Sequence, residues 1–81
     1  MTTNLELTID DGLRLAEVRS LCRRGFARKV RVDAHLSMSD VARIVGVHRV
    51  SILNWELGKR EPQGQPALRY AELLRRLRDG A

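Results

Sequence analysis

The hydrophobic and polar positions of this chain repeat mainly with the period of an α-helix, with apolar residues three or four positions apart. The pattern predicts helices over about 10–24, 26–34, 38–45, 48–57 and 67–80, with a loop at 59–66. Gly25 either separates the first two helices or bends one long helix, because glycine in a helix interior costs about 1 kcal/mol relative to alanine. The sequence therefore predicts an all-α fold, a small bundle of about five helices.

The N-terminal segment follows a different pattern. Leu5, Leu7 and Ile9 alternate with polar residues, which is typical of a short strand or an ordered arm. A single edge strand has no partner in so short a chain, so it would need a second copy of the protein or would form a loose tail. Both interpretations stay open. Thr8 or Asp10 is suited to cap the helix that follows.

Two further helices are expected to be amphipathic. In the helix at 26–34, one face carries residues spaced four apart, namely Phe26, Val30 and Ala34. The helix at 67–80 combines an apolar stripe with a basic outer face.

The two central helices are closely joined. Ser37 and Asp40 have the spacing of a capping box at the start of the first, and Gly46 suits the left-handed residue that ends it. Only Gly46 and Val47 connect the two helices, and so short a connection forces a steep crossing, as in a helix-turn-helix. Its packing predicts contact among five inward residues, Val41, Val45, Val47, Ile52 and Trp55. Ala42 and Gly46 would occupy the tight points.

The helix at 48–57 carries apolar side chains on two sides. At 100° per residue, Ile52 and Trp55 point toward the expected core. Four residues point the other way, namely Arg49, Val50, Leu53 and Asn54. A DNA major groove suits this mixed surface, because it offers acceptors to arginine, an adenine edge to asparagine and thymine methyl groups to apolar side chains. Alternatively, Val50 and Leu53 pack against the N-terminal helix or a second subunit.

The composition narrows the class of protein. The 81 residues carry a net charge of +5, which favours an anionic partner. Residues 1–22 hold two basic and four acidic side chains, whereas the remainder holds 13 basic and 6 acidic ones. The apolar runs are too short to span a membrane, the start lacks the features of a signal peptide, and a lone cysteine fits a reducing compartment. We therefore expect a cytoplasmic protein.

The polar residues do not suggest an enzyme. Cys22, His35 and His48 lack the spacing of metal ligands, and a fourth ligand is missing. The sequence contains no glycine-rich phosphate loop and no nucleophile paired with a base. We expect no catalysis, no cofactor, no metal and no small-molecule ligand.

Residues 36–62, LSMSDVARIVGVHRVSILNWELGKREP, resemble the helix-turn-helix domains of the Cro and phage-repressor type, also called the xenobiotic-response-element class. The similarity includes Ala42, Gly46, Ile52, the Trp55–Glu56 pair, Gly58, Arg60 and Pro62. Residues 66–77 look like the last helix of that family. Since the family begins near Phe26, residues 1–24 form an additional arm and helix before a DNA-binding domain at 25–81, within one compact unit. The addition would brace the domain or form a subunit interface.

The resemblance implies that the second helix enters the major groove and that the first lies across the DNA backbone. It carries base contacts onto Arg49, Val50 and Asn54, with Ser51 and Leu53 at the margin. It carries phosphate contacts onto Ser37, Met38, Ser39, Lys59 and Arg60. It also pairs Glu56 with Arg31, a structural salt bridge that holds the recognition helix, while Trp55 and Ile52 support that helix from the core.

Two of these residues depart from the family pattern. Met38 stands where glutamine is usual, so only its backbone N–H can bind a phosphate by hydrogen bond. His48 replaces the usual serine or threonine cap of the recognition helix. It is expected either to cap poorly or to contact a phosphate itself.

The function expected from these features is that of a sequence-specific regulator of transcription that binds double-stranded DNA, a repressor or control protein of the phage or mobile-element type. One recognition helix reads only about four or five base pairs, so we expect a homodimer or side-by-side copies on DNA. The N-terminal segment or the last helix would form the interface between copies. One alternative is an architectural or recombination-directionality DNA-binding protein. Another is a protein-interaction module, such as an antitoxin.

Overall fold

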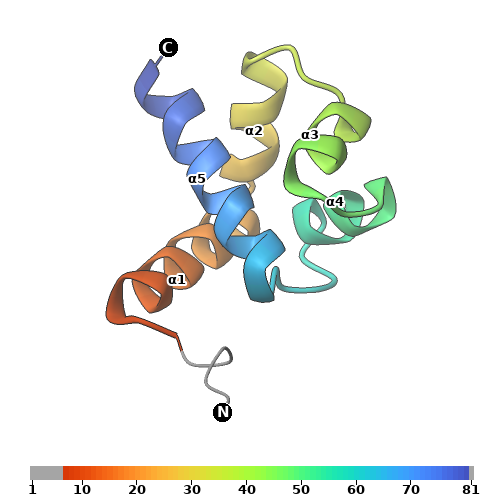
Figure 1. Cartoon of the computed structure of the whole chain (residues 1–81). Coiled ribbons are helices and arrows are strands. Elements are labelled where there is room, and N and C mark those ends of the chain that lie inside the picture. Colours follow the sequence, from red (N-terminus) through yellow and green to blue (C-terminus); the bar gives the residue numbers. More distant parts are fainter. Residues whose placement is uncertain (1–6, 81) are drawn as a thin grey trace.

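The structure, a computed structural model, describes residues 7–80, and this part of the chain is all-α with no strand (Figure 1). Its helices are α1 (Ile9–Arg23), α2 (Phe26–Asp33), α3 (Met38–Val45), α4 (Arg49–Glu56) and α5 (Gly64–Gly80). In Figure 1, α3 and α4 lie together on one side of the molecule, and α5 packs against α1, α2 and α3. The predicted bundle of about five helices is confirmed.

The structure tests only part of the prediction made for the N-terminal segment. Most of the proposed strand or arm lies outside the described residues. Ile9 is the first residue of α1 and not the end of a strand. Thr8 is the N-cap: its hydroxyl oxygen accepts from the Asp11 backbone N–H at 3.0 Å, and the Asp11 carboxylate accepts from the Thr8 N–H at 3.2 Å. This capping box explains why the helix begins where it does.

Gly25 separates α1 from α2, which settles the alternative left open by the sequence. Its φ of +79° lies in the left-handed region that favours glycine. The buried residues of α2 are Ala27 and Arg31, and Val30 packs against the core beside them. Phe26 is 41% exposed, and the Arg24 guanidinium lies 4.9 Å from the centre of its ring.

The core forms around the crossing of α3 and α4. Its cluster comprises Val18, Leu21, Cys22, Ala27, Val41, Ala42, Val45, Ile52, Trp55, Tyr70, Ala71 and Leu74, and Val47 packs at its margin. The predicted packing of the two central helices is therefore confirmed. The Trp55 and Tyr70 rings lie 5.1 Å apart at an angle of 36°. This contact fixes α4 on α5.

Gly46 does not occupy a tight point, contrary to the prediction. A Cβ atom at this position would meet only the Arg69 Nη1 atom, at 3.9 Å. The requirement for glycine is conformational instead, since its φ is +89°.

The start of α5 also differs from the prediction. Residues 64–66, expected in a loop, belong to the first turn of this helix. Pro66 is compatible with that place, because backbone N–H groups in the first turn have no acceptor within the helix.

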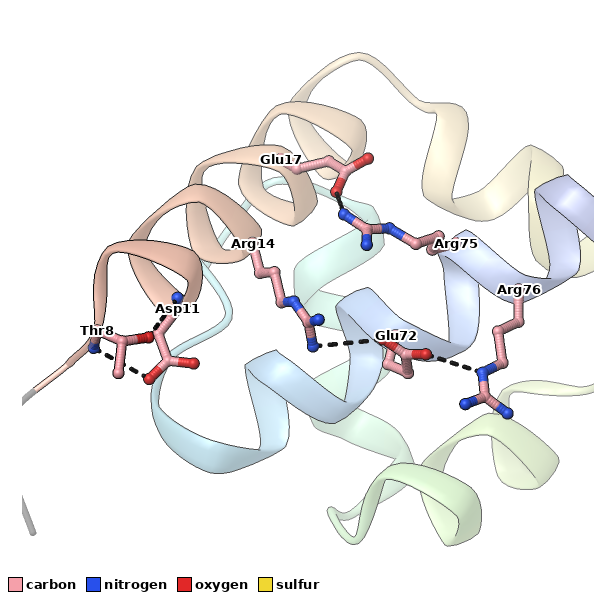
Figure 2. A network of polar contacts seen from close by, with 7 residues as sticks. All are labelled: Thr8, Asp11, Arg14, Glu17, Glu72, Arg75 and Arg76. Carbon is pink, nitrogen blue, oxygen red and sulfur yellow. Dashed lines mark hydrogen bonds and ion pairs between the residues drawn. The ribbon is translucent and has the colours of Figure 1, made fainter.

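The additional helix α1 packs as part of the same bundle. Leu15 and Val18 are buried, and ion pairs link α1 to α5 along its exposed edge (Figure 2). Arg14 lies 3.4 Å from Glu72, and Glu17 lies 3.3 Å from Arg75. Exposed pairs of this kind contribute little individually, about 0–1 kcal/mol each. Burial of the apolar side chains therefore holds α1 in place.

Candidate nucleic-acid interface

The start of α3 is built as the sequence predicted. The Ser37 hydroxyl oxygen accepts from the Asp40 N–H, and the Asp40 carboxylate accepts from the Ser37 N–H, both at 2.9 Å. These bonds from Ser37 hold the pKa of Asp40 below its ordinary value. Met38 packs its side chain against the core, whereas Ser39 is exposed. The backbone N–H groups of Met38 and Ser39 have no acceptor within the helix, so they can bind an anion.

Hydrogen bonds hold the end of α3 and the turn that follows it. The N–H groups of Gly46 and Val47 both donate to the Ala42 carbonyl, at 2.8 and 3.0 Å. Arg69 of α5 donates to the Ile44 carbonyl at 3.0 Å. Sequence reasoning missed Arg69, because its partner lies 25 residues away and no local pattern links them.

His48 is the N-cap of α4. Its Nδ1 atom accepts from the Val50 N–H at 3.2 Å, so His48 caps the helix despite replacing the usual hydroxyl residue. A neutral ring that accepts at Nδ1 carries its proton on Nε2. The imidazole is exposed, so its Nε2–H can donate to a group outside the protein.

The two faces of α4 are separated as predicted. Ile52 is fully buried and Trp55 nearly so, whereas Arg49 is exposed and Val50 is 46% exposed. Ser51, Leu53 and Asn54 are half-buried. Val50 is therefore not covered by the N-terminal helix, which removes one of the alternatives for it. The outer face combines a cation, an amide, a hydroxyl and two aliphatic side chains.

An ion pair joins α4 to α2 on its inner side. The Arg31 Nε and Nη2 atoms lie 2.6 and 3.0 Å from the two Glu56 carboxylate oxygens, and Nη1 donates to the Leu36 carbonyl at 2.9 Å. The hydrogen bonds to Glu56 raise the pKa of Arg31 above its ordinary value. Both side chains are buried. The pair implied by the resemblance is thus present, as a buried salt bridge at the end of α4.

The loop that follows α4 is held to the end of that helix. The N–H groups of Lys59 and Arg60 both donate to the Asn54 carbonyl, at 2.9 and 3.4 Å. The side chains of Lys59 and Arg60 are exposed. The Asn54 backbone carbonyl therefore fixes the start of the loop that carries the Lys59 and Arg60 cations.

No group of three potential metal-ligating side chains occurs between residues 7 and 80. None of the helices described is long and apolar enough to cross a bilayer.

Comparison with known proteins agrees with this geometry. A model of the helix-turn-helix family matches residues 28–78, which include α3, α4 and most of α2 and α5 but leave α1 outside. Searches of curated proteins and of solved structures returned no match. The match covers more than half of the chain and contains the crossing of α3 and α4. The chain belongs to the Cro/C1-type helix-turn-helix family of DNA-binding regulators.

Proposed function

We propose that this protein regulates transcription by sequence-specific binding to double-stranded DNA, with α4 as the recognition helix. The observation that carries the proposal is the separation of faces on α4. Ile52 and Trp55 anchor the helix in the core, whereas Arg49 and Val50 are left accessible. A helix fixed in this way can present its outer side chains to base edges without losing its own packing.

The outer side chains of α4 have complementary roles. Arg49 suits the O6 and N7 acceptors of guanine, and Asn54 suits the N6 and N7 edge of adenine. Val50 suits a thymine methyl group. Ser51 and Leu53 lie at the margin of this surface, where they limit which neighbouring bases fit.

The groups proposed to bind phosphate lie at the start of α3, at the start of α4 and in the loop after α4. They are the Ser37 hydroxyl, the Met38 and Ser39 N–H groups, the His48 Nε2–H and the side chains of Lys59 and Arg60. Helix N-termini favour phosphate because free N–H groups and the helix dipole point at it. Contacts of this kind set the position on DNA and carry no sequence information themselves.

In this role the protein acts by occupancy, as a repressor or control protein of the phage or mobile-element type, in the cytoplasm and on its DNA. Bound at a promoter, it blocks polymerase or recruits a partner. Two copies are needed, since one helix reads only about four or five base pairs. The site is then a partial inverted repeat with half-sites about 34 Å apart.

The outer side of α1 is the surface proposed for contact with the second copy. Ile9 and Leu13 are 84% and 64% exposed there, on the side opposite the buried residues of α1. Antiparallel pairing of two α1 helices through this stripe places Ile9 of one copy beside Leu13 of its partner. The apolar stripe is short, so the contact is weak alone and is completed on DNA.

The test is selection of duplexes from a random pool by the purified protein, followed by measurement of the mass of the complex. A single favoured DNA sequence that is arranged as an inverted repeat and is bound by two copies of the protein supports the proposal. A phased run of sites supports an architectural role instead. Absence of DNA binding at about 150 mM salt, with co-purification of a protein, supports an interaction module.

A further inference from the structure

Two arginines of α1 contact the loop between α4 and α5. The Arg19 Nε atom donates to the Pro62 carbonyl at 3.0 Å and lies 3.9 Å from the Glu61 carboxylate. The Arg23 guanidinium lies 3.5 Å from the same carboxylate. Pro62 is fully buried, so the carbonyl that Arg19 binds belongs to an anchored part of the loop. α1 is the helix that lies outside the matched family region.

The same loop carries Lys59 and Arg60, two of the proposed phosphate contacts. Its other end is held by the Asn54 carbonyl of α4, which accepts from the N–H groups of both residues. The loop is therefore fastened on two sides, by α4 at residues 59–60 and by α1 at residues 61–62.

Glu61 raises an electrostatic difficulty. Together with Ser51, Trp55, Arg60 and Gln63 it lines a hollow beside the recognition helix. A carboxylate here would repel a DNA backbone that approaches Arg60, because like charges a few ångströms apart are poorly screened at that range. Arg19 and Arg23 both lie within 4 Å of this carboxylate. They offset its charge from the side that faces α1.

We propose that Arg19 is a positioning residue for DNA binding: through the Pro62 carbonyl and Glu61 it holds the loop so that Lys59 and Arg60 meet the phosphate backbone. Arg23 assists by offsetting Glu61 alone. The inference rests on the proposed function and extends it to α1. A loop fixed in advance loses less conformational freedom on binding than a free one, which favours affinity.

The experiment compares three single variants of the full chain, each of which removes one positive charge from α1. Arg19→Ala removes both the hydrogen bond to Pro62 and the pair with Glu61, whereas Arg23→Ala removes only a pair with Glu61. Arg14→Ala is the matched control, because its partner is Glu72 of α5. Binding to a selected duplex and to a random duplex is measured over a range of salt concentrations. Circular dichroism establishes that each variant is folded at the temperature used.

Arg19→Ala is expected to weaken binding by about three- to tenfold on both duplexes, since a phosphate contact is lost. It is also expected to lower the salt slope, which is the slope of the logarithm of the binding constant against the logarithm of the salt concentration, by about one. Arg23→Ala is expected to have a smaller effect, and Arg14→Ala the smallest. Adding Glu61→Gln to Arg19→Ala should restore part of the affinity, because the uncompensated charge is then absent. A purely structural role for Arg19 would lower the active fraction and leave the salt slope unchanged.

Two results would overturn the inference while leaving the proposed function intact. One is an Arg19→Ala protein that binds both duplexes with the affinity and salt slope of the wild type. The other is an equal loss in the Arg14→Ala protein, which would indicate net charge alone. Failure of the wild-type protein to bind any duplex would instead contradict the proposed function.

Discussion

The guanidinium group of Arg31 binds both carboxylate oxygens of Glu56, at nitrogen–oxygen distances of 2.6 and 3.0 Å, across 25 residues of sequence. Glu56 is the last residue of α4, and Arg31 lies in α2. The pair is buried, whereas Arg49 and Val50 of α4 are exposed. The orientation of the recognition helix therefore depends on an ion pair that lies inside the protein.

Removing one partner of this ion pair should strongly lower the free energy of unfolding. Arg31→Met leaves the Glu56 carboxylate buried without its partner, and we expect a loss of about 3–5 kcal/mol in the free energy of unfolding. The double variant Arg31→Met, Glu56→Met should lose less, since no unpaired charge remains buried. Urea unfolding of both proteins measures the difference. A double variant that is less stable than the single one would contradict this explanation.

Substitutions at Val50 and Ile52 should separate binding from folding. Ile52→Ala leaves a cavity in the core and should cost about 2–5 kcal/mol of stability. Val50→Ala should change stability by less than about 0.5 kcal/mol, because the side chain is half exposed, but it should weaken preference for thymine at one base step. Thermal unfolding and binding to duplexes with each base at that step provide both readouts. Equal destabilisation by the two variants would show that Val50 is a core residue.

The cap of α3 should make stability depend on pH in the acid range. The bonds from Ser37 lower the pKa of Asp40 below its ordinary value of 3.8, so the stabilisation is present above that pH and is lost as pH falls through the lower folded-state value. The difference in melting temperature between the wild type and Asp40→Asn should therefore shrink as the pH is lowered from 7 to below 3.8. A difference that stays constant over this range would exclude a role for the ionised carboxylate.

The outer side of α1 should control association of two copies. Leu13→Glu places a charge in the middle of the proposed contact and should weaken formation of the two-copy complex on an inverted-repeat duplex by about tenfold or more. Val32→Glu is the matched control, because Val32 is also exposed and lies on α2. Analytical ultracentrifugation with labelled duplex measures both. An unchanged complex with Leu13→Glu would remove α1 from the interface.

The features that the sequence predicted best are set by neighbours in the chain. The Ser37–Asp40 cap, the left-handed Gly46 and the two faces of α4 all follow from residue types at short spacing. The inward place of Arg31 in α2 did not follow from local spacing, and its pair with Glu56 of a distant helix was expected only from the resemblance. The contact of Arg19 with Pro62 joins residues 43 positions apart, so no local sequence pattern predicts it. It is seen only in the folded structure.

The most direct test of the central claim compares Arg49→Ala with Lys59→Ala on the selected duplex and on all its single-base variants. Arg49→Ala should cost about 1–3 kcal/mol at one base step and relax the preference there, with other steps unchanged. Lys59→Ala should weaken binding to all DNA sequences alike and lower the salt slope by about one. Equal losses on the selected and on random DNA for both variants would contradict base reading by the outer face of α4.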